Sequence, residues 1–194
     1  MKLILVRHAE TDANLSGIIQ GGSSDNPLNE NGLNQAKKVA ECLKDKKIDL
    51  AFSSPAIRAK NTAEEILKFH KTTNLQISNE LNEKLAGEFE GMKSSEVKKI
   101  VTSASFKPKG GESFMDVYDR IKDFYLTILE NHKDQNILIV SHGALLGALQ
   151  LFILNKEISR EEYEPLRLKN AAYTILDIKD EAKLITLNNI EHLK

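Results

Sequence analysis

The sequence predicts an α/β fold of three layers, in which helices cover both faces of a mostly parallel sheet. Short apolar runs typical of strands alternate along the chain with longer segments whose apolar residues recur at helical spacing. Near the end of the chain two strand-like runs follow each other closely, which indicates a hairpin that adds an antiparallel edge. At 194 residues, with no repeat or linker, the chain is expected to form a single domain over residues 1–194.

Two strands and two helices alternate in the first part of the chain. Residues 3–6 and 50–52 are short apolar runs typical of buried strands. Between them, residues 31–43 are expected to form a helix, because these apolar side chains recur at helical spacing: Leu33, Ala36, Val39, Ala40 and Leu43. Ser54-Pro55 predicts the start of the next helix, since serine can cap and proline suits the first helical position. That helix is expected to end at about His70.

An irregular insert separates these elements from the rest. A third short strand is expected to end before it, at Ile77. Residues 84–111 contain four glycines and one candidate helix, residues 94–101, so we expect a small lid here and not a second domain. The predicted order after the insert is helix, strand, helix and two strands, at about residues 112–132, 137–140, 143–154, 173–178 and 184–187. Lys179-Asp180-Glu181 is expected to join the last two strands.

The charge balance argues against some classes of function. The chain has 27 basic and 28 acidic side chains, a formal net charge of -1, so we expect no nucleic-acid partner and no membrane. Any anion must then be bound by a few placed cations. Cys42 is the only cysteine, and the opening apolar run is too short for a signal peptide or a membrane span. These features predict a cytoplasmic protein. No feature of the sequence indicates which oligomeric state the protein has.

Two histidines and two arginines follow the predicted parallel strands. Arg7 and His8 come directly after the first strand, and His142 follows the strand at residues 137–140. Arg58 lies on the first turn of the helix after the second strand. Because ligands bind beyond the carboxyl ends of the strands in open α/β sheets, we expect these four side chains to converge on one site.

This combination of side chains favours an anion site. The histidines could instead bind a metal with Glu83 or Asp25 as a further ligand, but the arginines would repel the ion. Guanidinium groups match phosphate oxygens and stay charged, and a neutral imidazole can attack phosphorus. The leaving alkoxide then needs a proton, so a carboxylic acid is expected nearby. The residues therefore predict phosphoryl chemistry without metal or cofactor.

Six short motifs contain these residues, in this order along the chain: Arg7-His8-Ala9-Glu10-Thr11 with Asn14, Gln20-Gly21 with Asp25-Asn26-Pro27-Leu28, Ser53-Ser54-Pro55 with Arg58, Leu81-Asn82-Glu83 with Glu90-Gly91, Gly110-Gly111-Glu112-Ser113, and Ser141-His142-Gly143. Their order and spacing resemble the histidine phosphatase superfamily, in its phosphoglycerate mutase-like branch. The resemblance covers nearly the whole chain. There are two departures: Ala9 stands where glycine is commonest, and the loop after Gln20 is one residue longer.

The resemblance implies a role for each matched residue. His8 is phosphorylated during turnover, and Glu83 protonates the leaving group and then deprotonates the attacking water. The phosphoryl oxygens are held by Arg7, Arg58, Asn14 and His142. Further phosphate or substrate contacts are implied at Gln20, Gly21 and Gly143. A second branch of the family places an aspartate acid directly after the second histidine, but this chain has Gly143 there.

The insert decides between hydrolysis and phosphoryl transfer to a second hydroxyl. Mutases of this family are expected to carry a longer insert with arginine and tyrosine side chains, whereas residues 84–110 contain neither residue type. We therefore predict a metal-independent phosphatase that acts on a small phosphorylated metabolite, resembling α-ribazole phosphatase-like and broad-specificity members. The alternatives are a cofactor-dependent phosphoglycerate mutase-type transfer and a non-catalytic phosphate-binding protein on the same fold.

Overall fold

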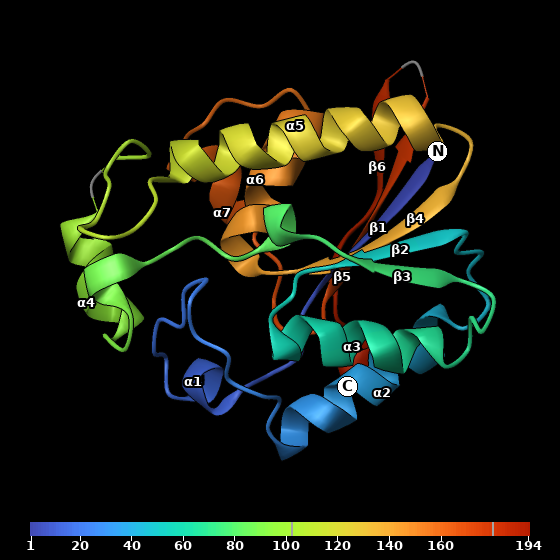
Figure 1. Ribbon diagram of the computed structural model, residues 1–194, viewed down its shortest axis with the longest axis horizontal. Coiled ribbons are helices and arrows are strands. Elements are labelled where there is room, and N and C mark those ends of the chain that lie inside the picture. Colours follow the sequence, from blue (N-terminus) through green and yellow to red (C-terminus); the bar gives the residue numbers. More distant parts are fainter. Residues whose placement is uncertain (102, 180) are drawn as a thin grey trace.

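Six strands form one mixed sheet in the order β3-β2-β4-β1-β5-β6 (Figure 1). The computed structural model describes residues 1–101, 103–179 and 181–194. The strands are β1 Lys2–Arg7, β2 Leu50–Ser53, β3 Asn74–Ile77, β4 Asn136–Ser141, β5 Tyr173–Ile178 and β6 Ala182–Asn189. The first four are parallel, and β5 and β6 form an antiparallel edge. This confirms the predicted sheet, while Asp180 of the predicted turn lies outside the described residues.

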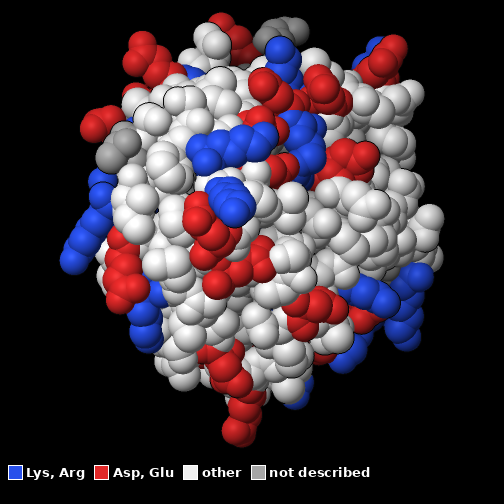
Figure 2. Space-filling model, turned by 60° about the vertical axis from the view of Figure 1, so that its left-hand side comes forward, with Lys and Arg blue, Asp and Glu red and all other residues white. Residues whose placement is uncertain are grey.

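Helices cover both faces of the sheet, as predicted. In Figure 1, α2 and α3 lie below the sheet, and α5, α6 and α7 lie above it. The helices are α1 Asp12–Leu15, α2 Glu30–Leu43, α3 Ile57–Leu67, α4 Ser94–Ile100, α5 Phe114–His132, α6 Gly143–Ile153 and α7 Arg160–Leu166. Among the helices in the described ranges, none is both long and apolar enough to cross a membrane. On the side that carries α4, basic and acidic side chains are intermixed (Figure 2).

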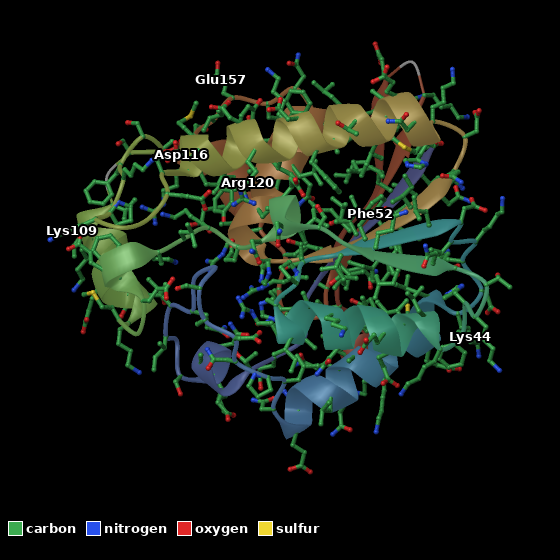
Figure 3. The ribbon with its side chains drawn as sticks, viewed as in Figure 1. Lys44, Phe52, Lys109, Asp116, Arg120 and Glu157 are labelled. Atoms are coloured by element: carbon green, nitrogen blue, oxygen red, sulfur yellow. The ribbon has the colours of Figure 1, made fainter. Side chains whose placement is uncertain are left out.

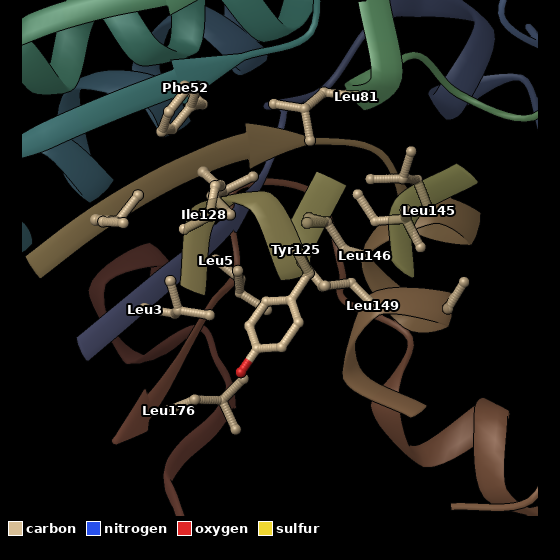
Figure 4. Packing of buried hydrophobic residues seen from close by; sticks show 14 of the residues in the cluster. Leu3, Leu5, Phe52, Leu81, Tyr125, Ile128, Leu145, Leu146, Leu149 and Leu176 are labelled. Carbon is tan, nitrogen blue, oxygen red and sulfur yellow. The ribbon is translucent and has the colours of Figure 1, made fainter. Parts of the chain in front are cut away.

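The central strands place apolar side chains on both faces of the sheet, because successive residues of a strand point in opposite directions. Leu3 and Leu5 of β1 pack with α5 and α6, whereas Ile4 and Val6 pack with α2 and α3. Figure 4 shows the first of these layers, with Tyr125 of α5 close to β1. Each fully buried Leu or Ile contributes about 2 kcal/mol. The strand ends that carry the polar side chains are therefore rigidly supported.

One local prediction was wrong, because the helix after β2 does not begin at Ser54-Pro55. α3 starts at Ile57 with Ala56 as its cap residue, and no side chain caps it. The Ser54 hydroxyl accepts from the Ala56 N–H at 3.3 Å, ahead of the helix, and also contacts His142 and Asn82. Leu33, one of the apolar residues that recur at helical spacing in α2, is 49% exposed. Gly32 faces inward instead, where a Cβ would lie 2.0 Å from the carbonyl oxygen of Glu10.

The insert at residues 84–111 packs against the loop that follows α1. Its own apolar cluster is small and consists of Ala86, Phe89 and Val97, with partly buried neighbours around it. The Ile19 N–H donates to the Met92 carbonyl, and the Gly91 N–H donates to the Ile19 carbonyl, each at 2.9 Å. The insert is thus fastened to the chain between β1 and β2.

Candidate active site

The two histidines lie side by side at the carboxyl edge of the sheet. Their ring centroids are 5.1 Å apart, with 61° between the planes. The sheet register explains this, because Arg7 pairs with Ser141 across β1 and β4, and each histidine is the next residue. The backbone N–H of His8 also donates to the backbone carbonyl oxygen of Ser141, at 2.9 Å.

His8 presents a neutral imidazole with one free nitrogen. The side chain is only 2% exposed, and Nδ1 lies 2.7 Å from the carbonyl oxygen of Ala9. Because a carbonyl only accepts, Nδ1 carries the proton and Nε2 keeps its lone pair. Burial, followed by the charges of Arg7 and Arg58, holds the pKa of His8 well below 6.5. An unprotonated Nε2 at neutral pH is what attack on phosphorus requires.

A buried arginine, Arg58, and a partly buried one, Arg7, flank this imidazole. Arg58 is 1% exposed, and it donates to the carbonyl oxygens of Ser24 at 2.7 Å and Gly21 at 3.0 Å. Arg7 donates to the carbonyl oxygen of Leu168 at 3.0 Å. Burial, and then Arg167, lowers the pKa of Arg7 to about 10, so it stays charged at neutral pH. Both Nε atoms are buried without a partner in the described part of the chain, which leaves two donors for an anion.

His142 is fully buried between β4 and α6. Its Nε2 lies 2.8 Å from Ser54 Oγ, which in turn donates to Asn82 Oδ1 at 3.2 Å. Nδ1 is buried and has no partner among the residues described. Burial, and then the nearby His8 and the arginines, lowers its pKa well below 6.5. Gly143 follows as the first residue of α6, and a Cβ there would lie 3.6 Å from the Arg7 guanidinium.

Glu83 is held by backbone N–H groups on the same side of the sheet. Its Oε1 accepts from the N–H of Lys84 at 2.9 Å, and its Oε2 accepts from Ala144 at the start of α6 at 3.3 Å. Burial lowers the pKa of Arg58, and the charge of Glu83 is the largest influence that raises it. The structure therefore brings Glu83 to the same cluster as both arginines.

The remaining predicted contact residues lie on the loops around this cluster. Asn14 Oδ1 accepts from Asn170 Nδ2 at 3.0 Å and from the N–H and hydroxyl of Thr11, so its amide NH2 is the group left for a ligand. Gly21 has a φ of 66°, and its carbonyl oxygen accepts a hydrogen bond from the Arg58 guanidinium. Gln20 is buried, and its side chain meets Asn26 at 3.4 Å.

Several residues of the site escaped the sequence interpretation. Asn170 contacts both the His8 carbonyl and Asn14, and Ser54 and Asn82 hold His142. Tyr163 on α7 packs edge-on against Phe114, and burial raises its pKa to about 12. The Ser159-x-x-Glu162 capping pattern could have predicted α7 and directed attention to it.

The described histidine and acidic side chains are not grouped in the way a metal ion requires. Within the described ranges there is no group of three or more histidine, cysteine, aspartate and glutamate residues placed to hold an ion. The cluster consists instead of two imidazoles, two guanidinium groups and one carboxylate around unpartnered donors. This arrangement suits a tetrahedral oxyanion.

A fold and a site of this kind define a phosphatase, and comparison with known proteins gives the family. The chain belongs to the histidine phosphatase superfamily (branch 1), whose family model matches residues 3–191. It is 32% identical to a metal-independent phosphoserine phosphatase of Arabidopsis thaliana, over 99% of this chain and 83% of the relative. It is 31% identical to phosphoserine phosphatase 1 of Hydrogenobacter thermophilus, over 98% and 92%.

A solved structure agrees with this assignment. The α-ribazole phosphatase of Shigella flexneri has a TM-score of 0.84 and 29% identity, with 97% of this chain and 96% of that chain covered. The predicted family, α/β fold and phosphatase activity are therefore confirmed. The protein is a hydrolase of phosphoric monoesters.

Proposed function

We propose that His8 is the nucleophile of a metal-independent phosphomonoesterase that acts on a small phosphorylated metabolite through a phosphohistidine. The observation that carries this is the free Nε2 of a buried neutral His8 next to two guanidinium groups with unpartnered Nε atoms. The named activity of the two phosphoserine phosphatases supports a small metabolite as substrate and hydrolysis without metal.

The reaction has two steps, transfer of the phosphoryl group to His8 and its hydrolysis by water. In the first, the His8 Nε2 lone pair attacks phosphorus, the bond to the ester oxygen breaks, and Glu83 gives that oxygen its proton. In the second, water attacks phosphorus, the Glu83 carboxylate takes a water proton, and the bond to Nε2 breaks. Arg7, Arg58, Asn14 and His142 hold the phosphoryl oxygens throughout.

The surrounding segments complete the proposal. Gln20 and Gly143 line the substrate side, and Gly21 acts by placing Arg58. The insert at residues 84–111 is a lid on a single domain, which the bonds between Ile19 and the insert support. A cytoplasmic location follows from the single cysteine, Cys42, which suits a reducing compartment.

The test is a phosphoenzyme trap with a labelled phosphomonoester in the presence of EDTA. Wild-type protein should accumulate acid-labile, base-stable phosphate and turn over without metal. His8→Ala should accumulate none, whereas His132→Ala, at the far end of α5, should behave as wild type. Full activity in His8→Ala, or strict dependence on added metal, would contradict the mechanism.

A panel of metabolite phosphates then defines the substrate. Phosphoserine is included because of the two relatives, and 3-phosphoglycerate is tested with and without 2,3-bisphosphoglycerate. Phosphate release supports hydrolysis as the physiological reaction, and isomerisation would favour the mutase alternative.

A further inference from the structure

An ion pair joins Arg120 of α5 to Glu112, just before that helix, and it faces the segment that carries Glu83. Arg120 and Glu112 form two parallel contacts, Nη2 to Oε2 at 3.1 Å and Nε to Oε1 at 3.3 Å. Both side chains are largely buried, with 22% and 18% exposure. Figure 3 shows Arg120 on α5 facing the segment that leads to Glu83. A two-point guanidinium–carboxylate contact of this kind is rigid, because the planar groups fix each other's orientation.

Arg120 fixes the backbone before Glu83. Its Nη1 donates to the carbonyl oxygens of Glu80 at 2.5 Å and Asn82 at 3.0 Å. The Arg120 guanidinium thus binds Glu112 through Nε and Nη2. Its third nitrogen, Nη1, binds the backbone of two residues that precede Glu83. A lysine at this position could not make all these contacts from a single ammonium in the same plane.

Glu112 fixes the backbone after Glu83. Its Oε2 accepts from the Leu85 N–H at 2.9 Å, and its own N–H donates to the Leu85 carbonyl at 2.8 Å. Lys84 Nζ donates to the carbonyl oxygen of Glu112 at 2.7 Å. The ion pair therefore holds the chain on both sides of Glu83, at the point where the insert begins.

We propose that Arg120 and Glu112 are positioning residues for the acid Glu83, which rests on the function proposed above for that carboxyl. A general acid must lie within hydrogen-bond reach of the leaving oxygen, and a displacement of about 1 Å can cost about a hundredfold in rate. Without the ion pair, the Glu83 segment would follow every motion of the insert. With the ion pair in place, the Glu83 carboxyl keeps its position when the insert moves.

Leaving-group dependence tests this assignment. A series of aryl phosphates is assayed, from p-nitrophenyl phosphate, which needs little protonation, to phenyl phosphate, which needs more. Arg120→Met and Glu112→Gln should lower kcat/KM about tenfold or more for phenyl phosphate and less than about threefold for p-nitrophenyl phosphate. Glu83→Gln is measured alongside, and so is the double variant with Arg120→Met.

The control is a second ion pair between the insert and α5. Lys107 Nζ lies 3.0 Å from Asp116 Oδ2, and this pair makes no hydrogen bond to residues 80–85. Lys107→Met should leave the leaving-group dependence unchanged. Circular dichroism and urea unfolding confirm that each variant is folded, and Glu112→Gln keeps an acceptor for Leu85 if Arg120→Met does not fold.

The outcomes separate the two proposals. In the Glu83→Gln background, Arg120→Met should add almost nothing to the leaving-group dependence, because the group it positions is gone. Equal losses for both substrates in Arg120→Met and Glu112→Gln, with a selective loss in Glu83→Gln, overturn the positioning role and leave the acid in place. An unselective loss in Glu83→Gln overturns the acid assignment, and the positioning role with it.

Discussion

His142 Nε2 lies 2.8 Å from Ser54 Oγ, a contact between residues 88 positions apart in sequence. Ser54 Oγ also accepts from the Ala56 N–H at 3.3 Å and donates its single proton to Asn82 Oδ1. The hydroxyl can therefore only accept from His142, so that Nε2 carries the proton in the free protein. One serine thus fixes the orientation of the second histidine and its tautomer in the free protein, and the ring gains a proton at Nδ1 when it holds a phosphoryl oxygen.

Ser54→Ala should remove this control. We expect kcat/KM to fall about tenfold, because the His142 ring loses its only hydrogen-bond partner among the described residues. Stability should fall by about 1–3 kcal/mol from the unpaired buried groups. Steady-state kinetics and urea unfolding measure the two effects. Ser53→Ala is the matched control, since its buried hydroxyl bonds to the Ser54 carbonyl and not to His142. An unchanged kcat/KM in folded Ser54→Ala would remove the assigned role.

Asn170→Asp should reorient the Asn14 amide while leaving Asn14 itself unsubstituted. The Asn170 amide NH2 donates to Asn14 Oδ1, and a carboxylate there would repel that oxygen. The Asn14 amide should then turn its oxygen toward the bound phosphate, and affinity for inorganic phosphate should fall about tenfold. Phosphate inhibition constants provide the measurement, with the exposed neighbour Lys169→Met as control. Identical constants in Asn170→Asp and wild type would show that Asn14 is oriented by other contacts.

Stability should fall as the pH drops below about 6.5. Burial above all keeps the pKa of His8 and His142 below that value in the folded protein, whereas the unfolded chain takes up protons on both. The unfolded state then binds more protons, so each histidine should cost about 1 kcal/mol between pH 7 and pH 5.5. Urea unfolding at both pH values measures this. His142→Gln should show a smaller loss than wild type or His132→Gln, and equal losses in all three would refute the linkage.

The polar residues at the strand ends could be predicted from the sequence because their placement follows from local patterns. Arg7, His8 and His142 each come directly after an apolar run, and parallel strands bring such positions to one edge. Glu83 has no such pattern around it, and only the family motif singled it out. The structure places it there through contacts with the start of α6.

The supporting residues could not be predicted, because their partners are distant in sequence. Ser54-Pro55 fits a helix start locally, yet the hydroxyl is used by a histidine from another strand. Arg120 has the spacing of an ordinary helix residue, and nothing local indicates that it reaches the carbonyl of Asn82. Propensity describes the backbone of a segment, whereas these roles depend on which segments the fold brings together.

The place of β4 in the sheet has a consequence for the order of folding. β4 lies between β1 and β2, although both precede it in the chain. Arg7 and His8 on one side and Arg58 on the other reach their spacing only when this strand has inserted between them. A growing chain that stops before Asn136 therefore contains most of the reactive groups and has no anion site. We expect phosphate binding to appear abruptly and late, as the long-range pairing completes.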